Sequence, residues 1–528
     1  MPPTFHIENF GCRAARADGE AVAALLRASG AGESRPTEAD VVIVNTCSVT
    51  AEADREARAY IRRAHRLNPA ARIIATGCYA QRAPEELAAI EGVAAVIGNS
   101  HKALAPEIAL HFLHVATDVP RNELHAAAIL TPAQFVSIPA LLAASGNQPP
   151  ILADDAFAHS FLEEAPVTPG AQTRPNLKIQ EGCSNRCSFC VIPQTRGNSR
   201  SLPANSVLSH IRNFVAAGGN ELVLSGINLG RWGRDRATHK NPAYSEATGF
   251  SPYNSKVVLS GVSAPEDNGP RTLAALVRAI LEETDLPRLR LSSIEPMDWD
   301  HDLTALMAEF SGTRLARHAH LPLQSGSDSV LRRMHRRYRP WHYAEKAREL
   351  LRVAGPALTL GADVMVGFPG ETDHEFQETC DFIRSLPFGY LHLFPFSPRP
   401  GTRAWTLHAA SPVPAAVVTE RMTALRSLAA EKTRAHRAQF LGTELDAITL
   451  HTPAALSLNG RTSALTENFL PIGLSASLPS NQLVRIRVTS LAADNNLHAS
   501  RVLSATSATD SRFSPIRVPR EPVLETAF

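Results

Sequence analysis

Three cysteines within eight residues constrain this 528-residue chain more than any other feature of its sequence. Cys183, Cys187 and Cys190 are spaced C-x3-C-x2-C, and we name them the central triad. Thiolates presented this closely can bind one iron–sulfur cluster from one side. Because only three are present, a four-iron cluster held here would keep one iron without a protein ligand. The spacing therefore predicts a 4Fe-4S site with one coordination position open to a cofactor or substrate.

A zinc knuckle is the alternative for cysteines this close together. Structural zinc sites use four protein ligands, commonly in paired C-x2-C halves. No histidine and no other cysteine lies within ten residues on either side of the central triad. The sequence therefore favours an iron–sulfur cluster over zinc.

Residues 1–100 alternate between short apolar runs and helical patterns. Runs at 4–8, 40–44, 72–75 and 93–97 are expected to be strands, with helices between them. Strands that alternate with helices predict a doubly wound parallel sheet, and hence an α/β fold class for this domain.

A second set of cysteines, the N-terminal triad, follows the first three of these strands. Its members are Cys12, Cys47 and Cys78. The carboxyl ends of parallel strands gather functional groups at one edge of the sheet. A lone cysteine there would usually be a buried core residue, but three in the same structural position favour a second 4Fe-4S cluster. We expect all six cysteines of the two triads to be catalytic metal ligands.

The rest of the chain divides by composition and periodicity. Six strand candidates alternating with helical patterns predict a partial (β/α)6 barrel, and short alternating pieces near the end predict a small β-barrel. The expected segments are a proline-rich variable linker (101–172), the barrel (173–412) with a polar insertion (234–269), a connecting helix (413–440), the small β-barrel (441–505) and a flexible tail (506–528).

Polar and glycine residues recur where the barrel strands are expected to end. Barrel active sites lie at the carboxyl ends of the strands. Glycine lets a ligand approach the backbone closely, and polar side chains can bond the ribose, adenine and amino groups of a nucleotide cofactor. The candidate cofactor-binding residues are Ser225, Gly226, Ser293, Glu295, Gln324 and Asp363.

Bulk properties add little about partners. The formal net charge is +2. The most basic run, Arg332–Arg339, suits either RNA phosphates or a solvated helix face. The N-terminus has no secretory pattern, and the most apolar window, 129–146, is broken by prolines, so we expect no membrane segment. Cysteines grouped as ligands predict a reducing, cytoplasmic location.

Three further stretches complete a resemblance to a known family. They are Asn45–Thr50 with Ala53–Arg55, Ser292–Pro296 and Leu391–Thr402. With the two triads, they resemble the radical SAM methylthiotransferase family, in particular the branch that modifies threonylcarbamoyladenosine in tRNA. The resemblance covers nearly everything except the linker, the insertion and the tail. One departure is Ala15, where the family usually has asparagine, so we expect different contacts around Cys12.

The resemblance implies a fold, cofactors and a reaction. The small β-barrel would be an RNA-binding TRAM domain. The cofactors would be S-adenosyl-L-methionine and two 4Fe-4S clusters. The central triad's cluster would reduce S-adenosylmethionine to a deoxyadenosyl radical, which takes hydrogen from carbon-2 of the modified adenosine at tRNA position 37. The N-terminal triad's cluster would supply sulfur, methylated by a second S-adenosylmethionine. The partners would be the tRNA anticodon stem-loop and an electron donor such as flavodoxin or ferredoxin.

Three alternatives remain open at this point. Two are enzymes of the same chemistry, which methylthiolate isopentenyladenosine in tRNA or an aspartate of a ribosomal protein. The third is a non-enzymatic iron–sulfur protein that binds RNA.

Overall fold

The structure, a computed structural model, describes residues 2–117, 128–131, 134–137, 148–162, 165–169, 172–237, 269–499 and 501–505. Most of the predicted insertion and the whole predicted tail lie outside these residues. Within the described part of the chain, no helix is long and apolar enough to cross a membrane.

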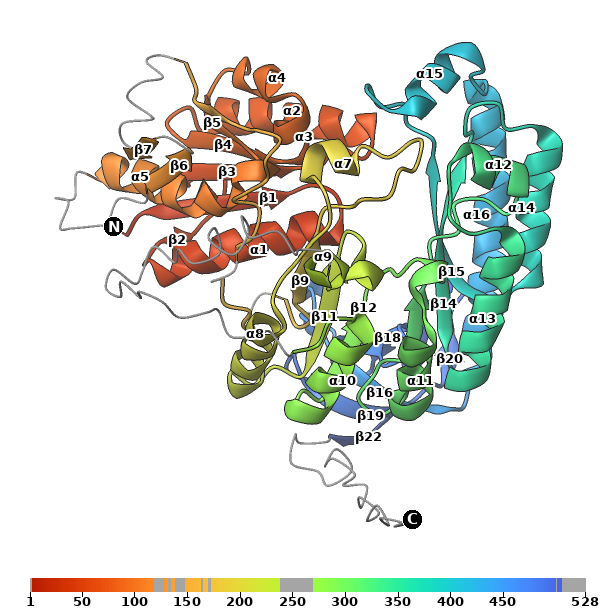
Figure 1. Cartoon of the computed structure of the whole chain (residues 1–528). Helices are drawn as coiled ribbons and strands as arrows, with labels where there is room; N and C mark the ends of the chain where they lie inside the picture. Colours follow the sequence, from red (N-terminus) through yellow and green to blue (C-terminus); the bar gives the residue numbers. More distant parts are fainter. Residues whose placement is uncertain are drawn as a thin grey trace, which may run out of the picture.

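The N-terminal sheet is parallel throughout, in the strand order β2-β1-β3-β4-β5-β8 (Figure 1). Its strands are β1 (Thr4–Asn9), β2 (Gly32–Glu33), β3 (Val41–Thr46), β4 (Arg72–Gly77), β5 (Val93–Gly98) and β8 (Ile151–Leu152). The helices that accompany it are α1 (Arg13–Ala28), α2 (Ala51–Leu67), α3 (Cys78–Arg82), α4 (Pro84–Ala88), η1 (Asn99–Leu104) and α5 (Ala105–Thr117).

Strand β3 shows why this sheet has helices on both faces. Every residue of β3 is buried. Val41 and Ile43 belong to the hydrophobic core that includes α1 and α5, whereas Val42 and Val44 belong to the core that includes α2 and α4. A strand buried on both faces reads as a continuous apolar run, which is typical of doubly wound parallel sheets. The predicted fold class is confirmed for this domain.

Two elements here differ from the sequence-based expectation. The sequence pattern predicts a helix from about Gly19 to Ser29, but α1 begins at Arg13, directly after Cys12, because its first turn is rich in alanine, the best helix former. Part of the expected linker is also ordered: Ile108 and Leu113 of α5, and Leu152 of β8, are buried in the core of the N-terminal sheet. A short hairpin, β6 (Ala128–Thr131) and β7 (Gln134–Ser137), lies between them in the sequence.

The barrel consists of two sheets rather than one. The first has the order β10-β9-β11-β12, and the second β13-β14-β15. In the described residues β12 and β13 form no ladder; an isolated bridge joins Leu289 of β12 to Leu315, which precedes β13. The strands are β9 (Asn176–Glu181), β10 (Arg200–Ser201), β11 (Glu221–Gly226), β12 (Arg288–Leu291), β13 (His318–His320), β14 (Thr359–Val366) and β15 (Phe388–Pro395).

Helices pack around these strands to form the largest hydrophobic core. They are α7 (Ile192–Arg196), α8 (Ala204–Ala216), η2 (Leu229–Arg231), α9 (Arg234–Ala237), α10 (Leu273–Glu283), η4 (Pro296–Asp298), α11 (His301–Phe310), α12 (Asp328–Arg333), α13 (Pro340–Ala354), α14 (Asp373–Ser385) and α15 (Arg403–Ala410). The sequence pattern predicts one helical stretch over 328–354, but the structure has two helices there, because Pro340 begins α13 and cannot continue a preceding helix.

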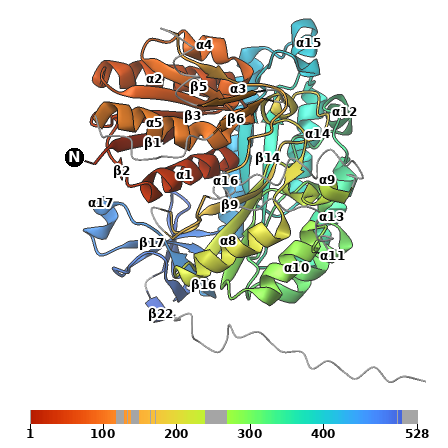
Figure 2. The same cartoon turned by 60° about the vertical axis from the view of Figure 1, so that its left-hand side comes forward.

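Helix α16 (Ala415–Ala438) leads from the barrel to a curled C-terminal sheet, in the order β20-β21-β18-β17-β16-β19-β22. Its elements are β16 (Glu444–Thr449), α17 (Ala454–Ser457), β17 (Thr462–Thr466), β18 (Pro471–Leu474), β19 (Leu483–Arg487), β20 (Ser490–Leu491), β21 (Leu497–Ala499) and β22 (Arg501–Ala505). Arg317, at the start of β13, pairs with Glu467 of this sheet. The sheet therefore closes the amino-terminal end of the barrel strands, and Figure 2 shows it below the N-terminal sheet.

Candidate active site

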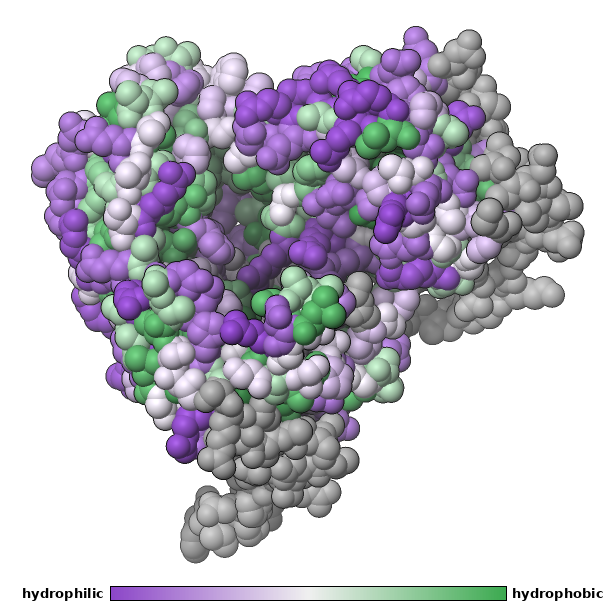
Figure 3. Space-filling view, turned by 180° about the vertical axis from the view of Figure 1, so that it is seen from behind, coloured by the Kyte–Doolittle hydropathy of each residue, from purple (hydrophilic) through white to green (hydrophobic). Residues whose placement is uncertain are grey.

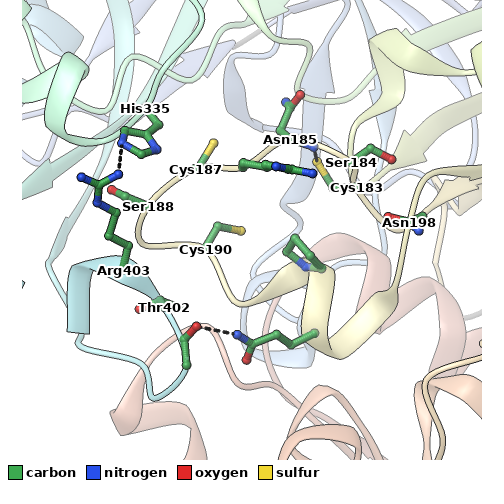
Figure 4. Close-up of a pocket in the computed structure, with 14 residues that line it drawn as sticks. Cys183, Ser184, Asn185, Cys187, Ser188, Cys190, Asn198, His335, Thr402 and Arg403 are labelled. Atoms are coloured by element: carbon green, nitrogen blue, oxygen red, sulfur yellow. Dashed lines mark hydrogen bonds between the residues drawn. The ribbon is translucent and has the colours of Figure 1, made fainter. Parts of the chain in front are cut away.

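The central triad lies on the loop that follows β9 and borders a cavity of about 360 Å³. Gly182 begins this loop with a φ of +68°, a conformation that favours glycine. The backbone N–H of Cys183 donates to the carbonyl of Gly197 at 3.0 Å, which holds the loop closed. Figure 4 shows the three cysteines spaced around the loop, with His335, Thr402 and Arg403 across the cavity.

Several donors point at the sulfur atoms of the central triad. The Asn185 backbone N–H lies 3.4 Å and the Asn228 Nδ2 3.6 Å from the Cys183 Sγ. The Arg336 Nη1 lies 3.3 Å from the Cys187 Sγ. Burial raises the pKa of the Cys190 thiol to about 12, so a metal that binds this sulfur must displace its proton. Donors of this kind stabilise anionic sulfur in a cluster site.

Arg336 connects the central triad to a predicted cofactor-binding residue. It is buried, and its Nη2 donates to both carboxylate oxygens of Glu295, at 2.6 and 2.5 Å. Glu295 and Cys187 therefore share one arginine, although more than a hundred residues separate them in the sequence.

The rest of the basic run is also paired with carboxylates. The sequence suggests either an RNA-binding surface or a solvated helix face. Both interpretations assume free arginines, and neither describes the paired side chains fully. Its ion pairs are Arg332 and Arg339 with Asp328, Arg333 with Glu375, Arg336 with Glu295, and Arg337 with Asp298.

The N-terminal triad lies at the carboxyl ends of β1, β3 and β4, which are neighbours in the sheet. Gly11 has a φ of +97° and packs closely on Cys47. A Cβ added to Gly11 would lie 2.5 Å from the Cys47 Sγ. Burial, together with the negative charge of Cys78 and Cys12, raises the pKa of the Cys47 thiol to about 12. Cys12 and Cys78 thus both lie close enough to Cys47 to act on it electrostatically.

Two side chains donate to the sulfur of Cys78: Asn99 through Nδ2 at 3.3 Å, and Arg196 through Nε at 3.2 Å. Ala15 stands where the resemblance predicts asparagine, and its contact with Asn45 is made by its backbone rather than by a side chain. The Ala15 carbonyl accepts a hydrogen bond from the Asn45 side chain, which also donates to the Asn9 Oδ1 at 3.0 Å. Asn45 thus orders the start of α1 behind Cys12.

The candidate cofactor-binding residues occupy three kinds of environment. Ser225 and Gln324 are buried, and among the described residues the Ser225 Oγ and the Gln324 Oε1 have no hydrogen-bond partner. Gln324 also has a φ of +63°, which is unusual for a residue other than glycine. Gly226 packs against Gln180, and Ser293 is exposed. Buried polar atoms without partners suit a bound ligand.

Asp363 belongs to a separate polar group on the inner side of β13–β15. Its Oδ1 lies 3.1 Å from both the His320 Nε2 and the His392 Nδ1. The Tyr390 hydroxyl lies 2.9 Å from the His320 Nδ1. Although burial opposes it, hydrogen bonding by both histidines lowers the pKa of Asp363, so this carboxylate is ionised. The ligand atoms of His320, Asp363 and His392 lie within 4.8 Å of one another.

Arg13 brings the N-terminal triad close to this polar group. It follows Cys12 directly, and its guanidinium lies 5.8 Å from the ring centroid of Phe469 in the C-terminal sheet. Burial lowers the pKa of Arg13, and the charges of Tyr390 and Asp363 oppose that shift. Residues of all three parts of the molecule therefore meet beside Cys12.

Comparison with known proteins agrees with this arrangement. Residues 4–98 match the uncharacterized protein family UPF0004, and residues 177–383 match the radical SAM superfamily. The threonylcarbamoyladenosine tRNA methylthiotransferase MtaB of Bacillus subtilis (strain 168) is 34% identical over 404 residues, which cover 76% of this chain and 75% of that protein. This chain belongs to the radical SAM methylthiotransferase family.

Further members of the family show the same extent of similarity. MtaB of Aquifex aeolicus (strain VF5) is 30% identical and covers 85% of this chain and 91% of its own length. The tRNA-2-methylthio-N(6)-dimethylallyladenosine synthase of Sorangium cellulosum (strain So ce56) is 31% identical, with 84% of this chain and 80% of that protein covered. The predicted family is thus confirmed.

The cofactors of a radical SAM methylthiotransferase are S-adenosylmethionine and two 4Fe-4S clusters, and the side chains present fit them. Each triad offers three sulfurs, which would hold a four-iron cluster with one iron free of protein ligands. The central triad borders an open cavity, and each triad has an arginine within 3.3 Å of one sulfur. The assignment of individual residues to S-adenosylmethionine remains a prediction.

Sequence reasoning did not identify four residues that the structure brings to these sites: Arg196, Arg336, His320 and His392. Arg336 was considered only as part of a basic run. His320 is the last residue of β13 and His392 lies within β15, and no spacing rule pairs them, because their strands lie on either side of β14.

Proposed function

We propose that this protein methylthiolates carbon-2 of N6-threonylcarbamoyladenosine at tRNA position 37, next to the anticodon. The observation that carries the proposal is the adjacency of the two cysteine triads: Arg196, from the helix just after the central triad, donates to a sulfur of the N-terminal triad at 3.2 Å. A radical enzyme that only methylated its substrate would not need the second triad.

When bound, the clusters and S-adenosylmethionine supply the radical chemistry that an aromatic C–H bond requires. The chain's own residues bind and orient. Arg336 holds Glu295 beside Cys187, where the carboxylate can bind the amino group of the cofactor. An electron donor such as flavodoxin or ferredoxin supplies the reducing equivalent.

The polar group on β13–β15 favours the threonylcarbamoyl substrate over isopentenyladenosine. Threonylcarbamoyladenosine carries a carboxylate, a hydroxyl and a urea, whereas the isopentenyl group is apolar. His320, Asp363, His392 and Tyr390 offer donors and acceptors, and Arg13 adds a positive charge near Cys12. Seen from behind, the surface is hollowed near its centre, with both hydrophilic and hydrophobic side chains around the hollow (Figure 3).

The deciding experiment is mass spectrometry of tRNA nucleosides from cells with and without the gene. We expect 2-methylthio-N6-threonylcarbamoyladenosine to disappear with the gene, while its unthiolated precursor accumulates. Loss of the methylthio derivative of isopentenyladenosine would select the other tRNA alternative. If neither nucleoside changes, the remaining enzymatic alternative is the aspartate of a ribosomal protein. Mass spectrometry of the ribosomal proteins would then detect its methylthiolation. Reconstituted protein that fails to cleave S-adenosylmethionine under dithionite would indicate a non-enzymatic protein.

A further inference from the structure

Five buried charged side chains meet at the junction of the N-terminal sheet and the barrel. We name them the junction network: Asp18 of α1, Lys102 of η1, Lys178 and Glu181 of β9, and Arg196 of α7. None of these side chains is more than 7% exposed.

Asp18 is the centre of the junction network. Its Oδ2 accepts from the Lys102 Nζ at 2.7 Å and from Arg196 at 3.2 Å, and its Oδ1 accepts from the Lys178 Nζ at 2.5 Å. Glu181 completes the network through Lys178 and through the Arg196 Nη1, which lies 2.7 Å from its Oε1. The bonds join the two parts of the chain at a point where water is excluded.

The charges of the junction network do not cancel. Three cationic side chains face two carboxylates, so one positive charge is formally unmatched. A buried charge is costly unless a charge of the opposite sign lies close by. The nearest candidate is the sulfur of Cys78, 3.2 Å from the Arg196 Nε. An anionic cluster bound at the N-terminal triad would supply the missing negative charge.

The network also touches the segments of both triads. Arg196 ends α7, which begins two residues after Cys190. Asn99 donates to the Cys78 Sγ at 3.3 Å and to the Thr195 carbonyl at 2.8 Å, so α7 is bonded to Cys78 directly and through one amide. Glu181 lies two residues before Cys183.

We propose that Arg196 is a positioning residue for the cluster of the N-terminal triad: it holds Cys78 in place and raises the reduction potential of that cluster. Hydrogen bonds to cluster sulfurs and nearby positive charge stabilise the reduced, more negative state. A residue of the radical SAM barrel thus sets a property of the cluster held by the other domain. The proposal rests on the two-cluster assignment, and it is independent of which nucleoside is modified.

The test uses the full chain with the central triad replaced (C183A/C187A/C190A), so that only the N-terminal cluster is present. Arg196→Met and Arg196→Lys are made in this background and reconstituted anaerobically. The readouts are iron per chain and the midpoint potential, from a redox titration followed by electron paramagnetic resonance. We expect a more negative midpoint in Arg196→Met, and a smaller shift in the same direction in Arg196→Lys, which keeps the charge.

Arg399→Met is the matched control. Arg399 is buried and joins the same two parts of the chain, through its Nη1 to the Asp54 Oδ2 at 2.6 Å, but it donates to no sulfur in the described structure. It should leave the midpoint unchanged. An unchanged midpoint in Arg196→Met with full iron, or an equal shift in Arg399→Met, would overturn the proposal. If Arg196→Met binds no iron, the midpoint potential of Arg196→Lys is used instead, and an unchanged midpoint with full iron would again overturn the proposal. A wrong nucleoside assignment would alter none of these readouts.

Discussion

At the scale of single residues, each cysteine triad pairs one of its sulfurs with a buried arginine from elsewhere in the chain. Arg336 approaches Cys187 at 3.3 Å, and Arg196 approaches Cys78 at 3.2 Å. Both arginines are also held by carboxylates, so their position is fixed before a cluster binds. Arginine suits this role because it stays charged when buried and donates in several directions at once.

The two triads are expected to act as separate metal sites. Cys47→Ala and Cys187→Ala should each lower iron from about eight to about four atoms per chain, because each removes one ligand of one cluster. Only Cys187→Ala should abolish reductive cleavage of S-adenosylmethionine under dithionite. Iron analysis and detection of deoxyadenosine check both statements. Full iron retention in Cys47→Ala would contradict a cluster at the N-terminal triad.

His392 provides the sharpest test of the polar group. His392→Phe removes one of the two histidines bonded to Asp363 and places an apolar ring there. We expect a lower rate of methylthiolation on tRNA, by about tenfold or more, the effect of losing about 1.4 kcal/mol of binding in the transition state. Iron content and substrate-free cleavage of S-adenosylmethionine should stay unchanged. His301→Phe, at an exposed position on α11, is the matched control.

At the scale of elements, buried charge joins the first strands of the barrel to one another. Glu221 of β11 pairs with Arg290 and Arg288 of β12 and with Arg174 before β9. Although burial opposes it, these arginines lower the pKa of Glu221 to about 2, so the carboxylate is ionised at any working pH. One acidic side chain therefore pairs with three cations, of which Arg288 and Arg290 are buried.

Glu221→Gln should destabilise the barrel strongly. The substitution keeps the shape but leaves three arginines without their carboxylate, and breaking a buried pair in this way costs about 3–5 kcal/mol. Glu283→Gln breaks an exposed pair with Arg212, and should cost about 1 kcal/mol or less. Thermal unfolding of both variants gives the comparison. Similar melting temperatures for the two would show that the buried group contributes no more than a surface pair.

Helix α16 introduces a pH dependence through His436. This residue is buried, and its Nε2 lies 2.9 Å from the Thr359 Oγ1. Burial, with a smaller effect from Arg437, lowers the pKa of His436 to about 4. The unfolded chain therefore binds more protons than the folded chain between about pH 4 and pH 6.5, and stability falls as the pH falls through that range.

His436→Gln should remove this dependence while keeping a hydrogen-bonding side chain. Between pH 7 and pH 5, His436 alone should cost the wild type about 2 kcal/mol. The advantage of the wild type over the variant should therefore shrink as the pH falls, which thermal unfolding at both pH values measures. A constant difference between the two proteins would show that His436 is not the titrating group.

At the scale of the whole molecule, the N-terminal sheet is anchored to the carboxyl ends of the barrel strands. Asp54 of α2 accepts from Arg82 of its own domain at 2.9 Å and from Arg399 of the barrel at 2.6 Å. The Ala51 N–H donates to the Ser397 Oγ at 3.0 Å. These bonds and the junction network hold the two triads at a constant separation.

Asp54→Asn should loosen this junction without unfolding either part. It leaves Arg82 and Arg399 short of a carboxylate, so backbone amides around residues 49–55 and 396–402 should exchange hydrogen faster. Asp381→Asn, which breaks an exposed pair with Arg384 inside α14, should not change exchange there. Hydrogen exchange followed by mass spectrometry checks both. Unchanged hydrogen exchange in Asp54→Asn would mean that the junction network and the remaining contacts hold the two parts together without this carboxylate.

The sequence allowed prediction of what depends on local order. Cysteine spacing predicted the cluster site of the central triad, and apolar runs predicted the parallel sheet, because both patterns involve residues close together in the chain; S-adenosylmethionine was implied only by the family resemblance. Arg196 and Lys102 could not be identified this way, since their partners come from segments that meet only after folding. The interruption of the barrel between β12 and β13 depends on strand registers that no single strand encodes. The extent of α5 is not evident from the sequence, because its apolar residues lie in a stretch that prolines interrupt.

Helix α7 is only five residues long; it begins two residues after Cys190 and ends at Arg196. Adding or removing one residue within it would turn Arg196 by about 100° around the helix axis. Such a change would leave all six cysteines in the sequence and yet separate the sulfur of Cys78 from its arginine. The length of this short segment is therefore a requirement in its own right, and a chain of this family could lose the connection between its two clusters without losing a single ligand.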